Sequence, residues 1–152
     1  MIKRTVTYKD FDGNDRTEDL YFNLTQFEAT EMSMEMPTEI TEEASNIKTA
    51  NDATEAGERL VKKMGEKGIV EFVKALVLKA YGVKSEDGRT FKKSAAISEE
   101  FSQTVAFSNF MMELLSNEEE CNAFINGVIP SELATKMPTG ISTTKKTKQS
   151  LK

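Results

Sequence analysis

Histidine is absent from this sequence of 152 residues, and cysteine occurs only once. Without histidine, the chain lacks the commonest general base and the commonest transition-metal ligand of proteins. A single cysteine excludes an internal disulfide bond and a zinc site built from cysteines. Cys121 follows three glutamates, and we expect it to be a packed side chain rather than a nucleophile. The sequence therefore predicts no enzymatic activity, no catalytic residue, no metal and no cofactor.

Long apolar runs and phosphate-binding glycine motifs are missing as well. No segment approaches the roughly 20 apolar residues that span a membrane, and the first residues are not followed by the apolar region of a signal peptide. The glycines form neither GxxxxGK nor GxGxxG. A calcium loop that began at Asp10 would need glutamate at its twelfth position, where Tyr21 stands, so a turn is favoured there. We expect a cytoplasmic protein without a membrane partner.

Charge is unevenly spread along the chain. The net charge is −5, and residues 133–152 contain five lysines and no acid, so residues 1–132 carry a net charge of −10. An acidic body argues against a nucleic-acid partner. The Thr, Lys, Ser and Gln content of residues 138–152 predicts a disordered, solvated tail, with contact to an anionic surface as the alternative. We place a single domain at residues 1–137.

Two segments near the N-terminus, residues 2–8 and 16–22, alternate between apolar and polar side chains. The Asp-Gly pair between them is a strong turn signal, and together they predict a β-hairpin. Arg4 is the polar exception on the apolar face of residues 2–8, and Glu18 shares a face with Leu20 and Phe22. An isolated hairpin is marginal, so this one must pack on helices or pair with another chain. Its apolar face would carry Ile2, Val6, Tyr8, Leu20 and Phe22.

A helix is expected after the hairpin. Thr25 and Glu28 have the spacing of a capping box, and the helix must end before Pro37. Met32 and Met36 lie on a shared face of this helix. Such a methionine pair can form an adaptable binding surface or fill a core, and both alternatives stay open.

Residues 37–50 are acidic and polar and follow no clear period. They predict a mobile acidic linker that holds at most a weak turn of helix. A second helix is expected from Asp52 to about Lys67, with its end weakened by Gly65 and Gly68. Its inward side chains would be Ala56, Leu60, Val61 and Met64.

Residues 69–81 show the clearest amphipathic pattern, and Gly82 is the expected residue after the helix end. A turn is predicted over residues 85–89. Ser94 and Ser98 are candidate caps for a short helix that contains Phe101. The inward stripe of the helix over 69–81 would be Ile69, Phe72, Val73, Leu76 and Ala80.

Residues 101–130 predict two short helices with a break at Asn117 and a stop at Gly127, and a last short helix is expected over 130–137. These helices are apolar on nearly every side, so they must be buried in their own domain or against a partner. The whole pattern predicts an α+β fold, predominantly α-helical, in which an N-terminal β-hairpin precedes a small helical bundle. Candidate partner-binding residues are Phe107, Phe110, Met111, Met112, Met32 and Met36.

The order and wording of four segments resemble the tail assembly chaperones of long-tailed bacteriophages and of prophages of Gram-positive bacteria. The segments are the hairpin YKDFDGNDRTEDLYFNLT, the helix FVKALVLKAYG, the turn KSEDGRTFKKS and the block EEFSQTVAFSNFMMELLSNEEECNAFINGVIP. Residues 37–67 lie outside the resemblance. None of the four is a chemical motif, so no site residue can be transferred from the family.

The resemblance implies a non-enzymatic role in virion morphogenesis in the host cytoplasm. Such a chaperone binds the phage tape measure protein, keeps it soluble, helps to recruit the tail tube protein, and is left out of the finished virion. Self-association of the chain is a further expectation, independent of the resemblance. Many members are made in two lengths by ribosomal frameshifting, for which the codons of Lys145 and Lys146 are candidates. The alternative function is a structural virion protein, such as a tail or head-tail connector subunit.

Overall fold

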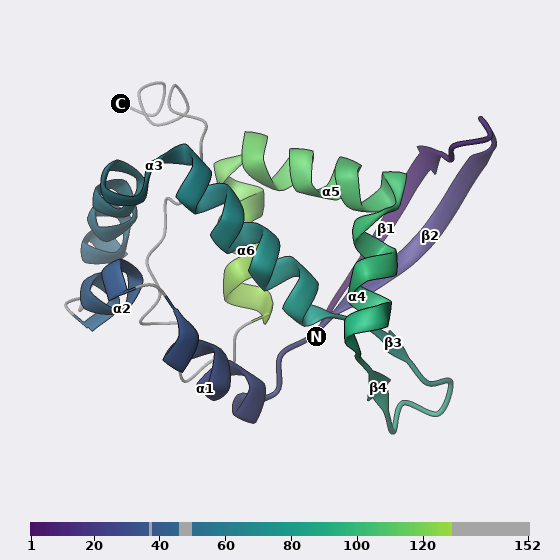
Figure 1. The fold of residues 1–152 in the computed structure, drawn as a ribbon, viewed down its shortest axis with the longest axis horizontal. Coiled ribbons are helices and arrows are strands. Elements are labelled where there is room, and N and C mark those ends of the chain that lie inside the picture. The colour runs from purple at the N-terminus through teal and green to yellow at the C-terminus, as the bar shows by residue number, and fades with distance from the viewer. Residues whose placement is uncertain (37, 46–49, 129–152) are drawn as a thin grey trace.

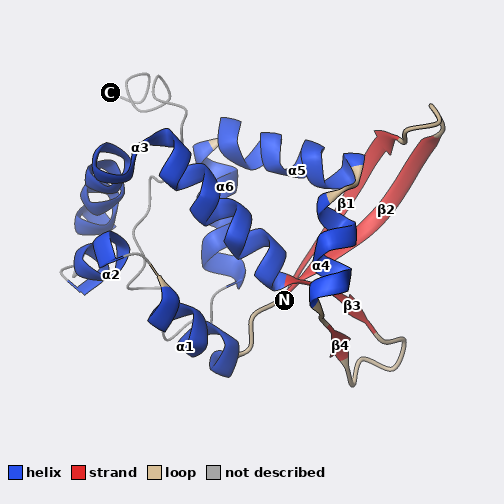
Figure 2. Ribbon diagram, viewed as in Figure 1, coloured by secondary structure: helices blue, strands red, loops and turns tan. Residues whose placement is uncertain are grey.

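The computed structural model describes residues 1–36, 38–45 and 50–128. Within them, a four-stranded antiparallel sheet of order β1-β2-β3-β4 lies at one side of the molecule and helices fill the other (Figure 2). The predicted α+β class, helical with an N-terminal hairpin, is confirmed. The elements in chain order are β1 (Ile2–Lys9), β2 (Asp15–Phe22), α1 (Gln26–Glu35), α2 (Thr38–Ser45), α3 (Ala50–Ala80), β3 (Tyr81–Lys84), β4 (Phe91–Lys92), α4 (Ala95–Ser102), α5 (Val105–Ser116) and α6 (Glu118–Val128) (Figure 1).

The predicted hairpin forms β1 and β2, paired from Ile2 opposite Phe22 to Lys9 opposite Asp15. Its turn is ordered by the Asp10 carboxylate, which accepts hydrogen bonds from the backbone N–H groups of the two turn residues at 12 and 14. The distal half of the hairpin extends beyond the helices (Figure 1), and residues 15–19 of β2 are exposed on both faces. Strand β2 therefore contributes to the core only from Leu20 onward, while Val6 of β1 also packs against the core.

Two strands, β3 and β4, were not predicted. The chain passes from α3 directly into β3, where Gly82 pairs with Tyr21 of β2. Gly82 does follow the end of α3, as predicted, but it lies in β3 and does not have the positive φ of a left-handed helix cap. A side chain at this position would place its Cβ 2.7 Å from the Phe91 ring and 2.8 Å from the Lys92 carbonyl oxygen, so glycine permits the close approach of β4.

The predicted linker over 37–50 is wrong for residues 38–45, which form helix α2. Its Ile40 side chain is fully buried. The Glu43 carboxylate is also buried, and it accepts hydrogen bonds from Arg59 and Lys63 of α3 at 2.9–3.0 Å. These partners come 16 and 20 residues later in the chain, so the local pattern of the segment could not indicate the helix.

Helix α3 is broken at Gly65, whose φ of 76° and ψ of 171° are not helical. Glycine adopts a positive φ without the steric cost that a side chain would add. The two predicted helices, over 52–67 and 69–81, are thus continuous apart from this kink, and the break lies at the first of the two glycines. The kink redirects the first half of α3 toward α2 (Figure 1).

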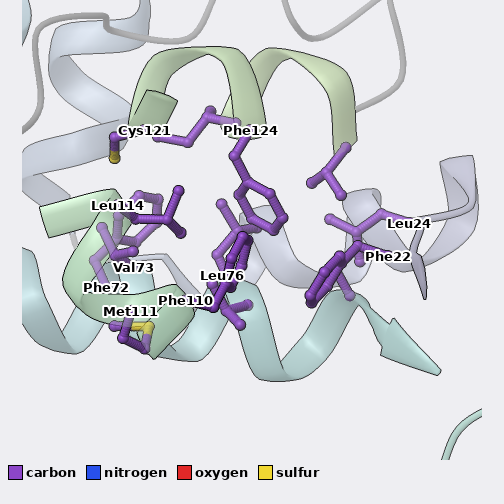
Figure 3. Packing of buried hydrophobic residues seen from close by; sticks show 14 of the residues in the cluster. Phe22, Leu24, Phe72, Val73, Leu76, Phe110, Met111, Leu114, Cys121 and Phe124 are labelled. Carbon is purple, nitrogen blue, oxygen red and sulfur yellow. The ribbon is translucent and has the colours of Figure 1, made fainter. Parts of the chain in front are cut away.

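The core lies between the sheet and α3, α4, α5 and α6. The Phe22 ring stacks on Phe110 with 5.0 Å between ring centroids, and Phe124 meets both rings edge-on (Figure 3). The predicted stripe of α3 is confirmed, since Ile69, Phe72, Val73, Leu76 and Ala80 are all buried.

Side-chain caps begin each of the last three helices. The predicted cap Ser94 accepts a hydrogen bond from a backbone N–H group of α4, and Thr104 and Asn117 do the same for α5 and α6. The other candidate cap, Ser98, lies inside α4, where its hydroxyl donates to the Leu78 carbonyl oxygen. Helix α6 continues one residue past the predicted stop at Gly127. The short helix predicted over 130–137 and the tail 138–152 lie outside the described residues.

Candidate partner-binding surface

Three of the six candidate partner-binding residues belong to the aromatic core. Phe110 and Met111 are 1% and 6% exposed, and Phe107 is 9% exposed. Composition could not separate a core residue from a partner-facing one, because both are large and apolar. In this structure, the side chains of these three residues stabilise the fold, and contact with a partner remains a prediction for them.

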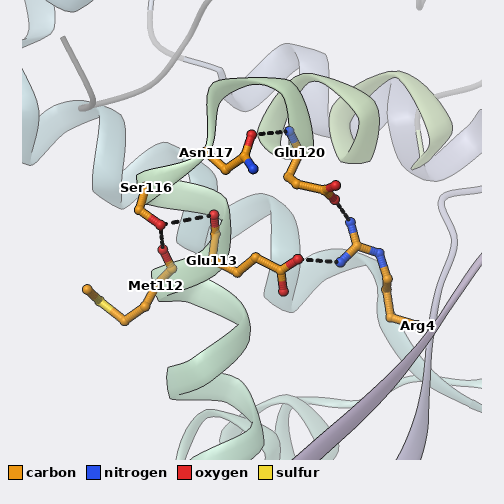
Figure 4. A network of polar contacts seen from close by, with 6 residues as sticks. All are labelled: Arg4, Met112, Glu113, Ser116, Asn117 and Glu120. Atoms are coloured by element: carbon orange, nitrogen blue, oxygen red, sulfur yellow. Dashed lines mark hydrogen bonds and ion pairs between the residues drawn. The ribbon is translucent and has the colours of Figure 1, made fainter. Parts of the chain in front are cut away.

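Met112 is 62% exposed on α5. Figure 4 shows it beside polar groups: Ser116 Oγ donates a hydrogen bond to its carbonyl oxygen, and Glu113 follows it in the helix. The Arg4 guanidinium bridges Glu113 and Glu120 and lies 5.4 Å from the Phe110 ring centroid, which explains a cation on the apolar face of β1. A single exposed apolar side chain in polar surroundings does not define a binding surface.

Met32 and Met36 behave differently, because they line a pocket between α1 and α3. The pocket has a volume of about 270 Å³. Met36 and Met64 are partly buried, whereas Met32 and Phe72 are buried. The apolar lining consists of Met32, Met36, Met64, Gly68, Phe72 and Ala75.

The position of α1 over α3 is set at its N-terminal end. The predicted capping box is present, with Thr25 Oγ1 accepting from the Glu28 N–H and Glu28 Oε1 accepting from the Thr25 N–H. Lys93 Nζ donates to Glu28 Oε1 at 2.9 Å and to the Asn23 carbonyl oxygen at 2.6 Å. Burial raises the pKa of Glu28, but the Lys93 ammonium and the capping bonds outweigh it and leave the pKa below its ordinary value. Glu28 is therefore an ionised anchor.

The C-terminal end of α1 has no comparable anchor among the described residues. Only Ala29 and Met32 of this helix are buried. Phe27 and Met34 of α1 do not line the pocket, and their side chains are 71% and 79% exposed. Helix α1 therefore carries apolar side chains on both its inner and its outer sides.

Both ionisable residues that line the pocket, Glu35 and Glu71, are acidic. Residues 28–43 contain six acids and no lysine or arginine. Two of these acids, Glu28 and Glu43, are paired with cations. The pocket is thus an apolar surface bordered by negative charge.

The chemistry that the described residues can support is limited. Burial, followed by the nearby charge of Glu118, raises the pKa of the Cys121 thiol to about 12, so the thiol stays protonated and is not a nucleophile. The described part of the chain holds no group of three His, Cys, Asp or Glu residues that could bind a metal ion. In the same part, no helix has the length and apolarity needed to cross a membrane.

Sequence reasoning found one wall of the pocket and missed the other. Met32 and Met36 were candidates, but Met64, Gly68 and Ala75 were not. The sequence did predict that Met64 faces inward. It could not show that Met64 lies next to α1, because the two helices come together only in the fold.

A comparison with models of protein families matches residues 1–151 to phage tail assembly chaperones. The match spans nearly the entire sequence, and the chain therefore belongs to the phage tail assembly chaperone family. Neither the curated proteins nor the solved structures contain a match. The family resemblance seen in the hairpin and the helical segments is confirmed.

Proposed function

We propose that this chain binds the tape measure protein of a long-tailed phage of a Gram-positive host, keeps that protein soluble, and helps to recruit tail tube subunits. It acts without catalysis in the host cytoplasm and is left out of the finished virion. The observation that carries the proposal is the family match over residues 1–151.

The surface of the protein supports this role. A chaperone of an apolar helical client needs accessible apolar side chains, and the chain provides them in the pocket between α1 and α3. Among the six candidate residues, we assign partner contact to Met32 and Met36, which line that pocket. Met112 serves as a comparison position, because its side chain is 62% exposed on α5 and does not line that pocket.

Co-expression with the tape measure protein of the same phage tests the binding step. We expect the tape measure protein to move from the insoluble to the soluble fraction and to co-purify with the chain. The core variant Phe110→Ala is the destabilised comparison, because a chain whose fold is weakened should keep less of the tape measure protein soluble. Equal solubility of the tape measure protein with and without the chain would contradict the proposal.

Mass spectrometry of purified virions separates a chaperone from a structural subunit. We expect no peptide of this chain in particles that contain the tape measure and tail tube proteins. Stoichiometric amounts of the chain in those particles would instead identify a tail or connector subunit.

A further inference from the structure

We infer that the pocket between α1 and α3 is the docking site for an amphipathic helix of a partner protein, whose apolar face is bordered by lysine or arginine. This inference rests on the proposed function, because the partner is the client that the chaperone keeps soluble. It adds the place of binding and the chemistry that is recognised.

The form of the pocket suits a row of side chains from a helix. Its volume of about 270 Å³ lies just below the range of about 300–1,000 Å³ typical of small-molecule sites. Gly68 contributes no side chain, and the α3 kink at Gly65 lies one residue from Met64. Residues of both α1 and α3 line the pocket, and amphipathic helices bind in apolar sites between helices through residues at i, i+3, i+4 and i+7.

The lining is adaptable. Met32, Met36 and Met64 each have an unbranched side chain with a polarisable sulfur, and such side chains adjust to apolar groups of different shape. A client that presents many different apolar segments requires this property more than it requires a close fit to one sequence.

The charge at the border selects the occupant. Glu35 and Glu71 line the pocket, and neither belongs to an ion pair among the described residues. A helix that carried glutamates beside its apolar face would bring like charges together, whereas lysines or arginines would be attracted. An acidic border therefore favours a cationic amphipathic helix.

Nuclear magnetic resonance of ¹³C-methyl methionine in the full chain tests the site directly. The probes are two synthetic peptides of about 18 residues with the same leucine face, one bordered by lysine and one by glutamate. We expect the lysine peptide to shift the methyl signals of Met32, Met36 and Met64 and to leave those of Met34 and Met112 in place. The glutamate peptide should bind at least about ten-fold more weakly.

Charge reversal at the border provides the second arm. The variant Glu35→Lys with Glu71→Lys should reverse the preference between the two peptides. It should bind the glutamate peptide at least about ten-fold more tightly than the lysine peptide. The matched control is Glu86→Lys with Glu99→Lys, which adds the same charge on the β3–β4 turn and on α4 and should leave the preference unchanged. These residues are exposed, so the fold is retained.

Several results would overturn the inference. Peptide shifts at Met34 or Met112 instead of the pocket would place binding elsewhere, and equal affinity for both peptides would remove the role of charge. Concentration-dependent shifts of the pocket signals without peptide would identify a second copy as the occupant. Pocket shifts on deletion of residues 129–152 would identify the basic C-terminal segment of this chain.

The failure of the docking site and the failure of the proposed function give different results. If the tape measure protein co-purifies equally with the wild type and with the charge-reversed variant, the pocket is not its docking site, while the proposed function stands. If the lysine peptide binds in the pocket but the tape measure protein is not kept soluble, the proposed function fails.

Discussion

The two sides of α3 differ in the kind of side chain that they bury. On one side, Phe22, Phe110 and Phe124 pack with 5.0–5.5 Å between ring centroids and are at most 1% exposed. On the other side, thioether side chains line a pocket that retains a volume of about 270 Å³. Aromatic rings have few torsions and specify one arrangement, whereas methionines have three and allow several.

This difference teaches how a small domain can be stable and still adaptable. The aromatic core joins the sheet to α5 and α6, and α1 adds only Met32 to the same buried cluster. Helix α1 is attached through its N-terminal anchor, Glu28 with Lys93, and through Met32. The proposed docking surface can therefore adjust to different apolar groups while the core remains fixed.

The largest expected effect comes from a truncation in the core. Phe110→Ala should lower the free energy of unfolding by about 3–5 kcal/mol, and Leu76→Ala by about 2–5 kcal/mol, because each leaves a cavity. Met36→Ala, in the pocket, should cost less than about 1 kcal/mol because its side chain is only partly buried. Urea denaturation measures all three, and a loss at Met36 equal to that at Phe110 would remove the contrast between the two sides.

A smaller effect is expected at the ion pairs that hold α2 on α3. Glu43→Gln leaves Arg59 and Lys63 without their carboxylate and should cost about 1 kcal/mol, since both cations are half exposed and screened by solvent. Glu113, which forms an exposed ion pair with Arg4, is the control position on the core side. Glu113→Gln should change the unfolding free energy less than Glu43→Gln does, and the reverse order would show that α2 is not held by these bonds.

Acid should loosen the pocket side before the core. The Arg59 and Lys63 hydrogen bonds hold the pKa of Glu43 below its ordinary 4.5, and the pKa of Glu28 is also lowered. A carboxylate with a lowered pKa in the folded state stabilises fully above about pH 4.5, and this stabilisation is lost as the pH falls from there through the folded pKa. During acidification, the methyl signals of Met32, Met36 and Met64 should broaden before the aromatic signals of the core change. If the methionine methyl signals and the core aromatic signals were lost at the same pH, the pocket side and the core would not differ in their stability to acid.

Local features were predictable from the sequence, and features that depend on distant partners were not. The caps at Thr25 and Ser94 and the α3 stripe follow from spacing alone, and the structure confirms them. Helix α2 depends on cations of α3, and the role of Gly82 depends on the approach of Phe91.

The candidate site was predictable only in part for the same reason. Helix periodicity placed Met32 and Met36 on one face, but the opposite wall of the pocket belongs to another helix. Phe107, Phe110 and Met111 were candidates because large apolar side chains look alike in a core and in an interface. Their burial could be assigned only after the sheet and α5 had been placed together.

The most direct test of the account is complementation of a phage that lacks this gene. Plasmids would supply the wild-type chain, the pocket variant Glu35→Lys with Glu71→Lys, or the control Glu86→Lys with Glu99→Lys, each verified to unfold at the wild-type urea concentration. We predict that the wild type and the control restore complete tails and plaques, whereas the pocket variant yields heads without tails. Full plaque formation with the pocket variant would contradict the claim that the methionine-lined side of α3 performs the chaperone function.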